Sequence, residues 1–232
     1  MATKSSALTF RVMQFMNEAS VKLRLKPVPL ATAATLYHRF FKVCSEKDFD
    51  PYLIASTCLY LGSKVEEDNL KLRDVVNVCY RCLHPNEAPL DMGQTYTSLK
   101  ESVAQCELLV LRQLEFHVNI SHPHKYLLYY LNSLDKWLHS SHLNIKSMIT
   151  RTSWAMLRDS YLTDMCLRYQ PDHVAVSVLY FALQCYGVDV PHSDLSEQAW
   201  WQAFVSDITI AQIRKIISEL IDLYDIENTV QQ

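Results

Sequence analysis

Apolar residues recur along most of this 232-residue chain at alternating spacings of four and three, the period of one face of an α-helix. The last such stripe comprises Ile210, Ile213, Ile217, Leu220 and Tyr224. No segment shows a sustained period of two, and the 8 prolines fall between stripes, where helices end. Each stripe ends within about 20 residues, which is too short for a coiled coil. The pattern predicts about ten packed helices in an all-α fold with no sheet.

Two segments of the chain read alike: residues 51–60 are PYLIASTCLY and residues 171–180 are PDHVAVSVLY. Four pairs are identical at one fixed offset, namely Pro51 and Pro171, Ala55 and Ala175, Leu59 and Leu179, and Tyr60 and Tyr180. Proline in a first turn and a small residue one turn later are typical of a central helix that its neighbours approach closely. Chance similarity between two apolar helices is the alternative. We predict a leader at 1–8 and two copies of one helical domain, at 9–118 and, with a C-terminal tail, at 119–232, with both alanines buried.

Composition excludes several classes of protein. Only 3 glycines occur, and they are isolated, whereas phosphate-cradling loops need clustered glycines. No apolar run approaches the roughly 20 residues of a membrane helix, and the N-terminus shows no signal-peptide core. The net charge of -3 disfavours general nucleic-acid binding. The 7 cysteines are odd in number and most lie in apolar stripes, which predicts buried free thiols in an intracellular protein.

Candidate metal and catalytic residues are few. Cys79 and Cys82 form one C-x-x-C pair, but structural zinc usually needs a second pair, so we interpret both as core residues. His122 and His124 flank a proline without a known metal-ligand spacing, which favours a turn at a helix start. No nucleophile, base and orienting group stand together in the sequence. We predict no catalytic residue, no metal site and no cofactor.

Two charges stand in apolar surroundings. Glu107 has apolar neighbours three and four residues away on both sides, and Lys64 follows the apolar run at residues 59–61. A charge covered by apolar surface needs a partner, because burying it alone costs several kcal/mol. The residues leave two interpretations open. The charges are solvated or paired within the chain, or they are anchors at an apolar protein interface.

The stretches around these charges resemble a known family. Residues 59–68, LYLGSKVEED, and residues 101–118, ESVAQCELLVLRQLEFHV, resemble the signature stretches of the cyclin box. The doubled domain is similar to the two tandem five-helix boxes of cyclins. HPHKYLL, RDSYLTDMCLRYQP and the pair Trp200–Trp201 resemble the transcription-associated cyclins, closest to the Q type, with the L and K types as alternatives.

The resemblance implies a kinase-binding site in the first box. Lys64 matches the lysine that bonds backbone carbonyls of the kinase, and Glu107 matches the glutamate that meets backbone amides beside the kinase αC helix. The matching pocket for a side chain of that helix comprises Leu61, Leu111, Phe116 and Val118. The acidic pair near the activation segment comprises Glu66 and Glu67. In the second copy Gln184 stands at the position of the lysine, so we expect the first box to make most of the contact.

The same resemblance implies a function and a partner. The chain would be a non-catalytic activating subunit that forms a heterodimer with a cyclin-dependent kinase, which for the Q type is cyclin-dependent kinase ten. We expect it in the nucleus, the cytoplasm or both, with no nucleic-acid or membrane partner. The alternatives are a general-transcription-factor-like cyclin fold that binds DNA and polymerase, which would need a basic face, and an α-helical enzyme that uses the cysteines and histidines.

Two features of cell-cycle cyclins are altered or absent. In cell-cycle cyclins the first helix carries the substrate-docking patch M-R-A-I-L, and the aligned run here is FRVMQ at residues 10–14. Gln14 replaces the last apolar residue, which puts docking of R-x-L substrates in doubt. No R-x-x-L or K-E-N stretch occurs in the sequence, so the mitotic destruction signals are absent. Both departures favour a transcription-type over a mitotic cyclin.

Overall fold

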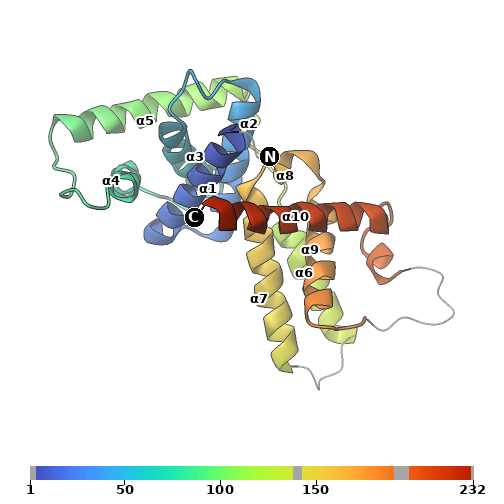
Figure 1. Ribbon diagram of the computed structural model, residues 1–232. Coiled ribbons are helices and arrows are strands. Elements are labelled where there is room, and N and C mark those ends of the chain that lie inside the picture. The colour runs from blue at the N-terminus through green and yellow to red at the C-terminus, as the bar shows by residue number, and fades with distance from the viewer. Residues whose placement is uncertain (1–3, 138–142, 191–198, 231–232) are drawn as a thin grey trace. The chain divides into compact units, whose positions relative to one another are not determined.

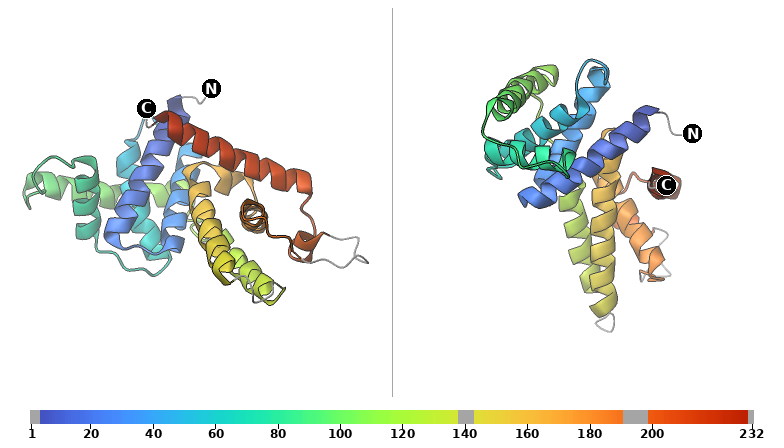
Figure 2. Two further views of the ribbon diagram at one scale, coloured as in Figure 1. Left: turned by 60° about the horizontal axis from the view of Figure 1, so that its bottom comes forward. Right: turned by 60° about the vertical axis from the view of Figure 1, so that its left-hand side comes forward.

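The computed structural model describes residues 4–137, 143–190 and 199–230, which form helices and no strand. The helices are α1 (Lys4–Leu23), α2 (Pro27–Val43), α3 (Pro51–Val65), α4 (Leu72–Leu83), α5 (Gln94–Gln113), α6 (Pro123–Trp137), α7 (Leu143–Asp159), η2 (Ser160–Leu162), α8 (Met165–Arg168), α9 (Pro171–Cys185), η3 (Trp200–Ala203) and α10 (Ile210–Val230). Figure 1 and Figure 2 show these helices along the chain. The predicted all-α class is confirmed. None of the described helices is long and apolar enough to cross a membrane.

The chain divides into two units. The first comprises Met1–Ile120 together with Tyr161–Leu167, and the second comprises Ser121–Ser160 and Arg168–Gln232. The short segment after α7 is held in the first unit by a buried contact, in which His38 Nε2 lies 2.9 Å from the carbonyl oxygen of Tyr161. Burial lowers the pKa of His38, so its ring is neutral at physiological pH. The predicted domain boundaries at 118 and 119 stay a prediction.

Helix α3 is the central helix of the first unit. It begins at Pro51, whose missing N–H costs nothing in a first turn, and the Asp50 side chain caps it by accepting from the Tyr52 N–H at 2.9 Å. It packs against α1, α2, α4 and α5. Ala55 is fully buried among them.

Helix α9 has the same place in the second unit. It begins at Pro171 and packs against α6, α7 and α10. Ala175 is fully buried, as Ala55 is in α3. The predicted burial of both alanines is confirmed, so the repeat in the sequence corresponds to two helices with equivalent roles.

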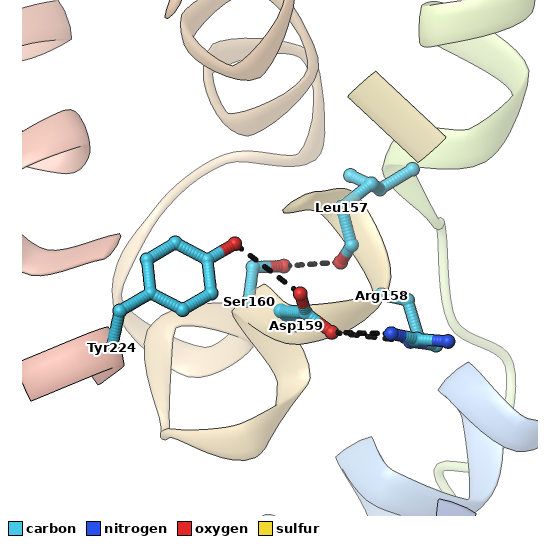
Figure 3. Close-up of polar contacts among 5 residues, drawn as sticks. All are labelled: Leu157, Arg158, Asp159, Ser160 and Tyr224. Carbon is cyan, nitrogen blue, oxygen red and sulfur yellow. Dashed lines mark hydrogen bonds and ion pairs between the residues drawn. The ribbon is translucent and has the colours of Figure 1, made fainter. Parts of the chain in front are cut away.

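Helix α10 is fixed to the second unit by polar contacts at two points. Figure 3 shows the Tyr224 hydroxyl directed at Asp159 at the end of α7, and it donates to Oδ2 over 3.2 Å. Arg158 donates to the other oxygen of the same carboxylate through Nε and Nη2. Earlier in α10, Glu219 accepts two bonds from the Arg168 guanidinium, at 3.0 and 2.7 Å. Burial opposes ionisation of Glu219, but these bonds still hold its pKa below the ordinary value.

The cysteines are free, and the prediction that they are buried is correct only in part. Cys58 and Cys79 are buried, but Cys185, on the last turn of α9, is exposed. Burial raises the pKa of Cys79 to about 12, which keeps this thiol protonated and unreactive. Among the described residues no group of three or more histidines, cysteines or carboxylates is placed to hold a metal ion.

Enlarging either central alanine should destabilise the fold. We expect Ala55→Leu and Ala175→Leu each to lower the free energy of unfolding by about 1–3 kcal/mol, because the added atoms overpack a filled core. Ala155→Leu is the matched control, since Ala155 is exposed on α7. Denaturant unfolding measures all three variants. Equal stability of Ala175→Leu and Ala155→Leu would contradict the equivalence of the two central helices.

Candidate functional site

Lys64 and Glu107 form one ion pair. Lys64 lies in the last turn of α3 and Glu107 in the middle of α5, with 2.5 Å between Nζ and Oε1. The hydrogen bond to Glu107 raises the pKa of Lys64 against the opposing effect of burial. The ammonium group also lies 4.9 Å from the centre of the Tyr60 ring. Of the two interpretations left open by the sequence, pairing within the chain is the one present in the structure.

The pair remains accessible from outside. The Lys64 side chain is 46% exposed and that of Glu107 is 17% exposed. Exposed pairs contribute only about 0–1 kcal/mol to stability, because water solvates the separated charges. Opening this pair for a partner therefore costs little, although the structure of the chain alone satisfies both charges.

Gly62 determines where the last turn of α3 lies. A Cβ at this position would come within 2.8 Å of the Pro29 carbonyl oxygen and 2.9 Å of the Ala33 nitrogen. Only a residue without a side chain lets α2 approach α3 this closely. This glycine, two residues before Lys64, thus positions the ammonium group opposite Glu107.

We expect Gly62→Ala to destabilise the protein by about 1–3 kcal/mol, because the new methyl group meets backbone atoms that cannot move independently. Gly93→Ala is the matched control, since a Cβ there meets no atom within 4 Å. The midpoint of thermal unfolding should fall clearly more for Gly62→Ala. Equal midpoints for the two variants would show that α2 and α3 can separate without cost.

The four residues assigned to the apolar pocket differ in exposure. Leu61 lies in the core, whereas Leu111 and Val118 are half-buried. Phe116 is 60% exposed. It follows Glu115 in a turn where both residues have positive φ, 51° and 60°, and the turn is closed by a bond from Phe116 N–H to Leu111 O at 2.8 Å. Positive φ is uncommon for bulky residues, so this turn after α5 holds the Phe116 ring in a strained exposed position.

The acidic stretch after Lys64 closes the end of α3. Glu66 accepts a bond from the Thr32 hydroxyl at 2.6 Å, whereas Glu67 is exposed and has a φ of 55°. Asp68, which is not among the predicted site residues, accepts from the backbone N–H of Lys26 at 3.1 Å. Glu66 and Asp68 therefore connect α3 to α2, and of the predicted pair Glu67 is the more exposed.

The segment aligned with the docking patch lies mostly in the core. Phe10, Val12 and Met13 on α1 are all buried, and only Arg11 of this run is exposed. Gln14 is half-buried. The apolar residues that would have to contact a substrate thus fill the interior of the first unit.

The position equivalent to Lys64 in the second unit is neutral and makes a local bond. Gln184 Nε2 donates to the Tyr180 hydroxyl oxygen at 2.9 Å, one turn away on α9. In α3 the corresponding pair is Lys64 and Tyr60. The second unit therefore lacks the charge of Lys64, as predicted from the sequence. The tyrosine one turn earlier is present in both units.

The two histidines before and within the first turn of α6 are buried. Burial, with a smaller effect of His122, lowers the pKa of His124 to about 4. Its ring packs edge-on against Trp154, with 5.2 Å between ring centres. His124 is therefore neutral at physiological pH and belongs to the core of the second unit.

Comparison with protein families gives two matches that follow one another along the chain. The family described as "Cyclin, N-terminal domain" matches residues 5–119. The family described as "Cyclin-T2-like, C-terminal domain" matches residues 138–223. The two matches confirm the predicted pair of cyclin domains, and the first includes every residue of the candidate site.

Relatives of known identity are similar over nearly all of this chain. Cyclin-L1 of Gallus gallus is 30% identical over 229 residues, which cover 94% of this chain and 41% of that relative. Cyclin-K of Danio rerio is 29% identical over 215 residues, which cover 91% of this chain and 48% of that relative. The chain thus spans less than half the length of these relatives.

Solved structures share the fold at low sequence identity. A chain in the crystal structure of the yeast RNA Pol II CTD kinase CTDK-1 complex matches with a TM-score of 0.73 and 18% identity. The match covers 95% of this chain and 66% of that chain. A chain in the yeast TFIIK complex (Kin28/Ccl1/Tfb3) matches with a TM-score of 0.65 and 19% identity.

Proposed function

The chain belongs to the cyclin family, and from this premise we propose that it is the regulatory subunit of a cyclin-dependent protein kinase. The observation that carries the proposal is the accessible Lys64–Glu107 ion pair at the family's signature stretches in the first unit. Opposite charges held 2.5 Å apart present a donor and an acceptor side by side. Such a pair suits neighbouring backbone carbonyl and amide groups of a partner that lack partners of their own, as at the end of a helix and in the loop beside it.

The proposed mechanism is a population shift in the kinase. An active kinase needs its strand lysine paired with the glutamate of its αC helix and its activation loop ordered. A rigid surface that binds only the αC-in state shifts the kinase toward that state by its differential affinity. In this proposal Lys64 and Glu107 orient the αC helix, and Leu61, Leu111, Phe116 and Val118 receive a side chain from it. Glu66 and Glu67 lie toward the activation segment, and the chain itself does no chemistry.

Two features of the first unit support this assignment. Phe116 is a large exposed apolar side chain held by a strained turn, as expected for a residue that becomes covered by a partner. Leu111 is half-buried on the helix that carries Glu107, so apolar and charged contacts lie on one element. The neutral Gln184 supports the first unit as the main contact with the kinase.

We propose the transcription-associated class, the Q type within it, and a heterodimer with cyclin-dependent kinase ten in the nucleus, the cytoplasm or both. The matches to L-, K- and T-type cyclins support the class. The structurally similar CTDK-1 complex is an RNA Pol II CTD kinase, which supports a kinase partner of this class. The Q type and its kinase rest on the residues quoted from the sequence.

Affinity capture from cells tests the proposal. The tagged chain is compared with the double variant Lys64→Ala/Glu107→Ala, and captured proteins are identified by mass spectrometry. The matched control is Glu18→Ala/Lys22→Ala, which removes another exposed Lys–Glu pair of the first unit, 2.6 Å long. We expect a cyclin-dependent kinase with the unchanged chain and the control, and little with the double variant. Capture of DNA and polymerase without a kinase would instead favour the general-transcription-factor alternative.

A further inference from the structure

The second unit carries a half-exposed group of aromatic side chains around Tyr180 and η3. We call it the aromatic patch, and it comprises Tyr129, Tyr180, Gln184, Trp200, Trp201 and Phe204. The rings of Tyr180 and Trp200 are nearly parallel, at 12°, with 6.2 Å between their centres. Trp201 stands edge-on to both, at 5.3 and 5.8 Å. Phe204 extends the group by contacting Trp200 and Tyr129, which is 63% exposed.

The segment that carries η3 follows α9 in the second unit, as α4 follows α3 in the first unit. There α4 spans 12 residues between α3 and α5 and buries Val75, Val76 and Cys79. Between α9 and α10 the described part of the chain has only η3, which spans 4 residues and buries none of them. The indole rings of Trp200 and Trp201 contact Tyr180 on α9 and stay half-buried. Tyrosine and tryptophan are enriched at protein interfaces, which makes this group a candidate interaction site.

The chemistry of the patch is neutral and rich in donors. None of its six side chains carries a charge, and Gln184 stands where the first unit has Lys64. Within the described residues the indole N–H groups of Trp200 and Trp201 have no hydrogen-bond acceptor. Among the residues that the structure describes, the only hydrogen bond between side chains of the patch joins Gln184 to Tyr180. Apolar rings and carbonyl acceptors on a ligand would therefore complement this surface.

We propose that the aromatic patch binds an uncharged, proline-rich segment of a partner protein. Proline rings stack on aromatic planes, and a polyproline II helix has no internal hydrogen bonds, so its carbonyl groups are free. Because proline has no N–H, such a segment offers acceptors only, which complements the indole N–H donors of Trp200 and Trp201. An acidic segment would lose hydration against these rings without gaining a counter-charge. The inference does not depend on kinase binding.

Fluorescence anisotropy of a labelled decaproline peptide tests this inference on the full chain. A glycine-serine peptide of equal length is the comparison ligand. We expect saturable binding of decaproline only, weakened by about tenfold or more in Trp200→Ala and in Trp201→Ala, because truncated aromatic anchors cost the most affinity. Trp201→Phe keeps a ring but loses the N–H donor. Its affinity for decaproline should lie between that of the unchanged chain and that of Trp201→Ala. Lys64→Ala, in the first unit, should bind decaproline as the unchanged chain does.

Other outcomes overturn the inference. Equal binding of the two peptides, or unchanged decaproline binding by tryptophan variants that unfold at the same temperature as the unchanged chain, would contradict it. Should Trp200→Ala and Trp201→Ala be unstable, Trp201→Phe and Gln184→Ala at the edge of the patch provide the test. Unchanged decaproline binding by both of these variants contradicts the inference. Preferential binding of an amphipathic helical peptide, or a dimer that dissociates in Trp200→Ala, would assign the patch to a different occupant.

Discussion

Lys64→Ala and Glu107→Ala should each weaken kinase binding by about 2–5 kcal/mol, the usual cost of truncating one partner of a buried charged contact at an interface. The same variants should lose at most about 1 kcal/mol of folding stability, because the pair is partly exposed and water solvates the remaining charge. The contrast between the two numbers separates an interface anchor from a structural salt bridge. Isothermal titration calorimetry with the purified kinase and denaturant unfolding of the free chain measure the two quantities.

The control for this prediction is the exposed pair of Glu18 and Lys22 on α1. Removing it should change neither kinase binding nor stability by more than about 1 kcal/mol. If Glu107→Ala unfolds readily while its kinase affinity stays the same, the ion pair holds α3 to α5 and has no part in the interface.

Phe116→Ala should weaken kinase binding by more than about 2 kcal/mol, because exposed aromatic anchors that become buried at the centre of an interface dominate its affinity. Phe116 is 60% exposed in the free chain, so its truncation removes little core packing. We therefore expect an almost unchanged melting temperature together with a large rise in the dissociation constant.

Tyr129→Ala is the matched control for Phe116→Ala. Tyr129 is a similarly exposed aromatic residue, at 63%, but it belongs to the second unit. It should leave kinase affinity within about 0.5 kcal/mol, as most surface substitutions do. A larger loss for Tyr129→Ala than for Phe116→Ala would move the main kinase contact to the second unit.

The helices were predictable because their signals are local. The prolines that open α3 and α9 and the spacing of apolar residues act within a few turns, so the sequence alone indicates both central helices. Burial follows from the same periodicity, and Ile213 and Leu220 of the last stripe indeed lie in the core. Local periodicity also explains why Ala55 and Ala175 are buried at equivalent positions.

The geometry of the candidate site was not predictable in this way. Lys64 and Glu107 are 43 residues apart, and their pairing depends on how α3 and α5 pack, which no local pattern reveals. The exposure of Cys185 has a similar origin, because the apolar stripe continues through it and only the packing of the helices decides whether it is covered. The exposure of Phe116 depends on two residues with positive φ, and nothing in Glu115-Phe116 itself favours that conformation.

The aromatic patch could not be predicted from local sequence patterns either. Trp200 and Trp201 were noted only as part of a family resemblance, and their contact with Tyr180 is visible only in three dimensions. One signal was present in the sequence, since Gln184 breaks the match with Lys64 while Tyr180 preserves the match with Tyr60. A changed charge beside a retained aromatic residue indicates that the two copies present different surfaces.

The rate of phosphoryl transfer by the captured kinase tests the central claim most directly. The purified kinase is assayed alone, with the unchanged chain, with Lys64→Ala/Glu107→Ala, and with the control Glu18→Ala/Lys22→Ala, all at one concentration. We predict that the unchanged chain and the control raise the rate by at least about tenfold, the effect of a 1.4 kcal/mol shift toward the αC-in state, and that the double variant does not. A rate that is the same with and without the unchanged chain, or equal activation by the double variant, would contradict the account.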